Sequence, residues 1–159
     1  MNITILCIGK LKETYWTDAV SEYSKRLRNY CNLEILELKE VRLPDNASAL
    51  EEAFVREQEG QNLLKKIRKE MYVISLEIQG KHLGSEAFAE QLSDLAISGR
   101  SNVVFVIGGS LGLSTEVSDR ADMKLSFSKM TFPHQMMRVI LLEQIYRGFK
   151  ILKNEMYHK

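Results

Sequence analysis

Three glycines follow the most strand-like run of the chain. Gly108, Gly109 and Gly112 come directly after the apolar, β-branched segment 102–107. Glycine accepts positive φ angles and lets another molecule approach the backbone closely. In open α/β sheets, ligands bind beyond the carboxyl ends of the strands. This segment therefore predicts a ligand-binding loop, and a tight turn that touches no ligand is the simpler alternative.

The spacing of these glycines argues against two common nucleotide sites. A dinucleotide fingerprint has the pattern GxGxxG after the first strand, whereas this loop has GGxxG after a late strand, and only Gly9 follows the first one. The loop also lacks the GK[ST] ending of a phosphate-binding P-loop. A Rossmann-like oxidoreductase is therefore a weak alternative.

A second polar segment, residues 127–134, precedes the expected last helix. Its hydroxyls and peptide groups can pair with the edge of an adenine without any charged side chain, and Pro133 at a first helical position is a start signal. The alternative is an ordinary strand–helix connection in which His134 caps the helix or packs at its start.

The last three residues offer a different chemistry. Tyr157, His158 and Lys159 provide an aromatic ring, an imidazole and a cation, which are suited to stack on a base, exchange a proton and contact a phosphate. The alternative is a frayed chain end.

Hydrophobic periodicity predicts the elements that position these residues. Strands are expected at 3–8, 33–38, 71–76, 102–107 and around 124–127, and helices from Thr14 to 27, from Ser48 to about Lys69, from Ser85 to near Gly99, from Ser114, and from about Pro133 to Leu152. This alternation predicts one α/β domain spanning residues 1–159, with a mostly parallel sheet flanked by helices.

Two of these helices carry further signals. Ser48 and Glu51 match a capping box, and the acidic-then-basic order between 51 and 69 complements the helix dipole, with Gly60 as a weak point in the middle. The last helix is apolar around most of its circumference, including Ile140 and Leu141. Such coverage predicts burial on two sides, against the sheet and against a second copy in a homodimer.

Composition limits the possible partners. The 159 residues include 22 basic and 21 acidic side chains, a net charge of +1, so the strongly basic footprint of many RNA-binding domains is missing. An RNA target would need a local patch, a second subunit or a large assembly. The apolar run 3–8 is too short for a membrane span and lacks signal-peptide flanks. Cys7 and Cys31 are expected to be reduced, in a cytosolic protein.

Three motifs, taken in order and at this spacing, resemble one family. They are Ile107-Gly108-Gly109 with Gly112-Leu113-Ser114, Ser128 with Met130-Thr131-Phe132-Pro133-His134, and the terminal Tyr157-His158-Lys159. The whole chain resembles the ribosomal RNA large subunit methyltransferase H family, which are minimal SPOUT-class enzymes. The resemblance implies methylation of N3 of a pseudouridine in 23S ribosomal RNA, with S-adenosylmethionine (SAM) as methyl donor and no metal. It also implies a homodimer and a C-terminal trefoil knot, which general topology rules would not have predicted.

The resemblance also assigns residues. By position, the SAM-binding residues would be Leu76, Gly108, Phe127, Ser128, Lys129, Met130, Thr131 and Phe132. Tyr157, His158 and Lys159 would serve the RNA substrate as catalytic residues, with His158 as the candidate base. Many relatives end in arginine, and Lys159 keeps the charge without its bidentate geometry. A SAM-dependent enzyme for another RNA base and a non-enzymatic ribosome-binding module stay as alternatives.

Overall fold

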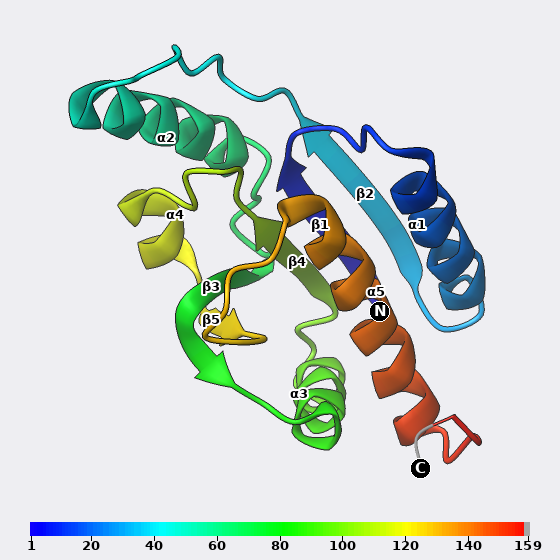
Figure 1. Cartoon of the computed structure of the whole chain (residues 1–159). Helices are drawn as coiled ribbons and strands as arrows, with labels where there is room; N and C mark the ends of the chain where they lie inside the picture. The colour runs from blue at the N-terminus through cyan, green and yellow to red at the C-terminus, as the bar shows by residue number, and fades with distance from the viewer. Residues whose placement is uncertain (158–159) are drawn as a thin grey trace.

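The computed structural model describes residues 1–157 and is built on a five-stranded parallel sheet (Figure 1). The sheet has the order β2-β1-β4-β3-β5, with strands β1 (Asn2–Ile8), β2 (Asn32–Leu38), β3 (Tyr72–His82), β4 (Asn102–Ile107) and β5 (Met123–Ser126). The helices between and after them are α1 (Thr14–Leu27), α2 (Ala49–Leu64), α3 (Ser85–Ile97), α4 (Thr115–Arg120) and α5 (His134–Leu152). The α/β class and the flanked parallel sheet are confirmed.

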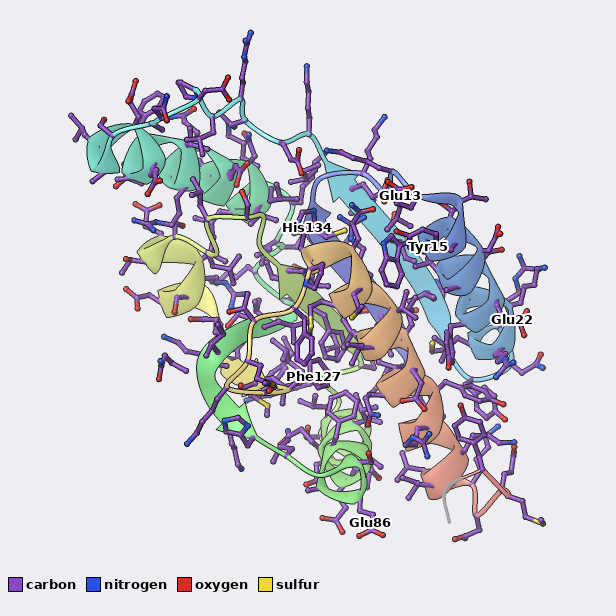
Figure 2. All side chains as sticks on the ribbon, viewed as in Figure 1. Glu13, Tyr15, Glu22, Glu86, Phe127 and His134 are labelled. Carbon is purple, nitrogen blue, oxygen red and sulfur yellow. The ribbon has the colours of Figure 1, made fainter. Side chains whose placement is uncertain are left out.

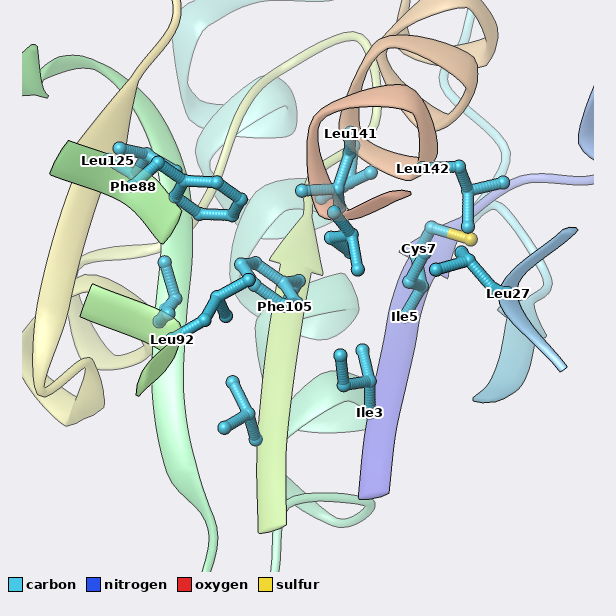
Figure 3. Packing of buried hydrophobic residues seen from close by; sticks show 14 of the residues in the cluster. Ile3, Ile5, Cys7, Leu27, Phe88, Leu92, Phe105, Leu125, Leu141 and Leu142 are labelled. Carbon is cyan, nitrogen blue, oxygen red and sulfur yellow. The ribbon is translucent and has the colours of Figure 1, made fainter. Parts of the chain in front are cut away.

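The two faces of the sheet have separate cores, because side chains alternate along each strand. On one face, Ile5 and Phe105 belong to a buried cluster that α1, α3 and α5 cover. On the other face, Leu6 and Val106 lie under α2 and α4. Figure 3 shows the first cluster, with Leu141 and Leu142 of α5 above β1 and β4. The central strands are buried on both sides, as their continuous apolar runs predict.

All five strands are parallel, so their carboxyl ends meet at one edge of the sheet. At this edge lie the glycine loop after β4, the segment after β5 and the second half of β3. Segments that are far apart in the sequence, and that were expected to bind a ligand, are thereby brought together.

The first turns of α5 are fixed by one buried side chain. Arg138 is 1% exposed. Its guanidinium donates hydrogen bonds to the backbone oxygens of Ile8 (3.0 Å) and Gly9 (2.7 Å), and it forms an ion pair with Glu37 Oε1 at 2.6 Å. Arg138 therefore joins α5 to the carboxyl ends of β1 and β2.

The capping box at the start of α2 is confirmed, since Ser48 Oγ accepts a hydrogen bond from Glu51 N and the Glu51 carboxylate accepts one from Ser48 N.

Two expected boundaries are wrong. Helix α2 ends at Leu64, so the basic residues of 65–69 lie beyond its last turn. The chain must turn there to enter β3 at Tyr72. Strand β3 in turn continues to His82, well past the expected end at Leu76.

The start of the last helix lies one residue later than expected. Helix α5 begins at His134, so Pro133 is its N-cap residue and not its first helical residue. Cys7 and Cys31 are free thiols, and burial raises the pKa of each to about 11. Within residues 1–157, no helix combines the length and apolar character that crossing a membrane requires.

We predict that Arg138→Met lowers the free energy of unfolding by about 3 kcal/mol. The substitution leaves two backbone oxygens and the Glu37 carboxylate without their buried donor, and breaking such a pair costs about 3–5 kcal/mol. We take the lower end because Glu37 is 28% exposed and regains water. Urea unfolding followed by circular dichroism measures the change. The control is Arg68→Met, whose exposed ion pair with Glu70 contributes at most about 1 kcal/mol. Equal stability of the two variants would contradict the assigned role of Arg138.

Candidate functional site

A cleft of about 390 Å³ opens at the carboxyl edge of the sheet. Three backbone segments form its walls, namely the loop after β4, the second half of β3 and the segment after β5, and the first turn of α5 closes it. Its lining residues are Leu76, Glu77, Ile78, Ile107, Gly108, Gly109, Ser110, Leu111, Gly112, Leu113, Leu125, Ser126, Phe127, Ser128, Met130, Thr131, Phe132, His134 and Met137.

The glycine loop is both a tight turn and a wall of the cleft. Gly112 N donates a hydrogen bond to Gly109 O at 3.1 Å. Gly112 has φ +76°, a backbone conformation that residues with a Cβ atom rarely adopt. A Cβ atom on Gly108 would lie 2.7 Å from the backbone carbon of Gly112. The two sides of the loop therefore approach so closely that Gly108 cannot carry a side chain without moving them.

A bulge in β3 forms the second wall. Leu76 and Lys81 both lie opposite Leu125 of β5, so the residues between them leave the ladder. Bulges redirect side chains next to functional sites, and Glu77 and Ile78 in this bulge line the cleft. The Glu77 carboxylate accepts hydrogen bonds from Ser75 Oγ (2.5 Å) and Ser118 Oγ (2.9 Å). Glu77 was not among the predicted site residues, because the expected strand ended at Leu76.

The segment after β5 presents a fixed backbone. Ser126 Oγ donates a hydrogen bond to Ser128 O at 3.1 Å, and Ser128 Oγ accepts one from Met130 N at 2.9 Å. Figure 2 shows Phe127 beside β5 and His134 at the start of α5, the two ends of this segment. The hydroxyls thus hold the backbone in a turn whose remaining peptide groups can bind a ligand.

His134 packs at the start of α5 and does not cap it by a side-chain hydrogen bond. Its Nε2 atom is buried, lies 3.7 Å from Glu40 Oε1, and has no hydrogen-bond partner within residues 1–157. Burial and the nearby Arg138 lower the pKa of His134. The imidazole is therefore a neutral part of the cleft wall at neutral pH.

A buried acid lies behind the glycine loop. Glu59 is 5% exposed, its Oε1 accepts a hydrogen bond from Val41 N (3.0 Å), and its Oε2 faces Gly109. Burial raises the pKa of Glu59. From its place in the sequence, Glu59 was expected to be one of the acids that complement the helix dipole. The structure instead has it linking α2 to the chain after β2, close to the cleft.

The structure brings most of the expected cofactor residues together. Seven of the eight line the cleft: Leu76, Gly108, Phe127, Ser128, Met130, Thr131 and Phe132. Lys129 is exposed and is not a lining residue.

Of the expected RNA-facing residues, Tyr157 is the one that the structure describes, and it lies outside the cleft. Tyr157 is not a lining residue and contacts Glu143 and Tyr146 farther along α5. His158 and Lys159 lie outside the described residues.

The chemistry of the cleft suits a particular type of ligand. Its volume falls in the range of about 300–1,000 Å³ for small-molecule sites. Apolar side chains and peptide groups form most of its surface, and Glu77 supplies the acidic side chain of the lining. Such a cleft can hold a flat, neutral heterocycle between apolar walls and accommodate a cationic group. A nucleoside that carries a positively charged extension has both features.

Comparisons with known proteins point to the same chemistry. The model of the family described as "Predicted SPOUT methyltransferase" matches residues 1–158. Proteins named ribosomal RNA large subunit methyltransferase H from Clostridium kluyveri and Clostridium novyi are 56% and 58% identical over 159 residues, the full length of both chains. A solved structure of "a probable methylase family protein" from Haemophilus influenzae covers 99% of this chain and 70% of its own, with a TM-score of 0.56 at 14% identity, and thus shares the fold. This chain belongs to the SPOUT methyltransferase family.

Proposed function

We propose that this protein transfers a methyl group from SAM to a base of large-subunit ribosomal RNA. The observation that carries the proposal is the cleft, whose walls coincide with the segments that the sequence motifs single out. The names of relatives that are more than half identical over the full length support the RNA substrate. N3 of a pseudouridine is the proposed acceptor, in line with the family resemblance.

The cleft residues have complementary tasks toward the methyl donor. Leu76 and Phe127 would enclose the adenine, while backbone groups around Met130 and Thr131 would pair with its edge. Gly108 and the Gly112 backbone that it packs against would form the wall beside the ribose. Glu77, fixed by two serine hydroxyls, would offset the positive charge of the donor. Bound SAM supplies a methyl group activated by a sulfonium.

The acceptor nitrogen needs positioning and the loss of a proton. N3 of a pseudouridine is an imide, so its N–H bond breaks as the new N–C bond forms. In-line transfer needs the reacting atoms about 3–3.5 Å apart. His158 is the proposed acceptor of that proton, since an imidazole titrates near neutral pH. Lys159 is proposed to hold a phosphate or to favour the ionised imide.

A homodimer through α5 is part of the proposal. Ile140 is half-buried and lines a groove with Phe132 and Gln144, so it is available to a second copy. Leu141 was expected on the same interface, but its side chain is 0% exposed in the core of its own chain. The trefoil knot, which the SPOUT family implies, would hold the segment after β5 against the glycine loop.

The near-neutral charge favours an assembled ribosomal particle over free RNA. With a net charge of +1, the chain has little non-specific attraction for phosphates. Recognition would then depend on the shape of a large target, and the protein would act in the cytosol, where ribosomes are. A ribosome-binding module without enzymatic activity is the alternative, and it would not bind SAM.

The glycine loop provides a test of SAM binding. Gly108→Ala should weaken SAM affinity at least about tenfold, because the new Cβ would lie 2.7 Å from the Gly112 backbone and would shift the wall of the cleft. Isothermal titration calorimetry measures the affinity. Gly84→Ala is the matched control, since a Cβ there meets nothing within 4 Å. Wild-type protein that does not bind SAM would refute the proposed function.

Methyl transfer itself can be measured on ribosomes. Wild-type protein with radiolabelled SAM should label ribosomes from cells that lack the modification, and mapping should locate the label on a pseudouridine. Deletion of residues 157–159 should abolish labelling while SAM affinity stays within about twofold, because Tyr157 lies outside the cleft. His158→Ala with an unchanged single-turnover rate would exclude this imidazole as the base.

Two neighbouring residues of α5 separate the proposed dimer interface from the core. Ile140→Asp should yield folded monomers, because the charge falls on a half-buried position of the proposed interface. Leu141→Asp should unfold the chain instead, since it buries a charge in the core. Sedimentation velocity measures the mass and circular dichroism measures the fold. An Ile140→Asp protein that remains dimeric would place the interface elsewhere.

A further inference from the structure

The end of α5 does not fray, because it closes in a Schellman motif. Asn154 has φ +52°, the left-handed conformation that follows the last helical turn. Asn154 N donates to Ile151 O at 3.0 Å, and Glu155 N donates to Lys150 O at 2.9 Å, which are the two hydrogen bonds of this motif. The chain after residue 154 is thereby turned back along the helix.

Glu155 fixes the returning chain a second time. Its carboxylate accepts a hydrogen bond from the Tyr30 hydroxyl at 2.7 Å and pairs with the ammonium group of Lys150. Both contacts lower the pKa of Glu155. The tail is therefore attached to α5 and to the chain after α1.

Tyr157 then enters a socket formed by Tyr23, Glu143, Tyr146 and Arg147. The Tyr157 ring meets the Tyr146 ring edge-on, with 5.0 Å between their centroids. The Arg147 guanidinium lies 4.7 Å from the centroid of the Tyr157 ring. The Tyr157 hydroxyl donates to Glu143 Oε1 at 3.3 Å and lies beside Tyr23. The neighbouring Met156 is 94% exposed, so the socket selects one side chain of the tail.

We propose that Tyr157 is a positioning residue, which anchors the tail in this socket and sets the point from which His158 and Lys159 reach the RNA. The proposal rests on the proposed function and refines it, because the family resemblance placed all three terminal residues at the substrate. Two contacts on the ring and a hydrogen bond from the hydroxyl leave Tyr157 engaged by its own chain.

The electrostatics of the socket agree with an anchor. Burial, followed by the influence of the neighbouring Tyr23 and Glu143, raises the pKa of Tyr157 to about 12. The phenol therefore keeps its proton at neutral pH and acts as a hydrogen-bond donor to Glu143. A group that stays protonated is a poor acceptor for the proton of an imide nitrogen.

The test separates the ring from the hydroxyl. Tyr157→Phe keeps the aromatic contacts, whereas Tyr157→Ala removes them, and Tyr15→Ala is the control because Tyr15 is 62% exposed on α1. Hydrogen exchange at the amides of 154–157 measures anchoring without any substrate. Methyl transfer to ribosomes lacking the modification gives kcat and the KM for SAM.

An anchor predicts agreement between the two measurements. Tyr157→Ala should speed tail exchange and lower kcat, each by about tenfold or more, with the KM for SAM within about twofold. Tyr157→Phe should stay within about threefold of wild type in both measurements. A Tyr157→Phe enzyme as slow as Tyr157→Ala, or a slow Tyr157→Ala enzyme with unchanged exchange, would overturn the proposal. Wild-type protein that transfers no methyl group would instead refute the proposed function, while the exchange data would still test the anchor.

Discussion

The buried guanidinium of Arg138 is the interaction on which the site depends. A charged group that is 1% exposed is tolerated when it is paired and hydrogen-bonded. Here Nη1 and Nη2 bind the Glu37 carboxylate of β2 and the backbone oxygens at the end of β1, while Nε has no partner within residues 1–157. These contacts fix the direction in which α5 leaves the sheet. The segment after β5 must then span a set distance to His134, so a bond between distant parts of the chain shapes one wall of the cleft. Arg138 itself lines no part of that cleft.

A parallel sheet explains why so small a chain can form a site. Each strand delivers its following segment to the same edge, so the glycine loop and the segment after β5 meet without an additional domain. The ligand would contact mainly peptide groups and apolar side chains, which need no net charge. This agrees with a balance of 22 basic and 21 acidic residues. Under the proposed function, recognition of RNA would then depend on the shape of the assembled target and on a second copy.

Local sequence patterns predicted the strands and helices. The features that these patterns did not predict depend on contacts between distant parts of the chain. The strand over 102–107, the capping box at Ser48 and the glycine loop follow from residue type and spacing, and all three are present. The bulge before Lys81 was not predictable, because it exists only relative to the backbone of Leu125. Glu59 has the sequence signature of an exposed helix acid, yet tertiary packing buries it. The assignment of Leu76, Gly108 and 127–132 to a cofactor came from the family resemblance, and the cleft that they share, apart from Lys129, supports it.

The placement of the tail bears on the proposed homodimer. Tyr157 contacts Glu143 and Tyr146, which lie six and nine residues beyond Met137 of the cleft. At about 1.5 Å per residue, this corresponds to roughly 9–14 Å along the helix axis. The anchored tail of a chain therefore starts well away from its own cleft. If the terminal imidazole is to meet a base beside the methyl donor, the simplest source of a tail is a second copy packed along α5. In the proposed homodimer, the anchor would serve this arrangement, since a tail attached to one copy could be presented to the cleft of the other.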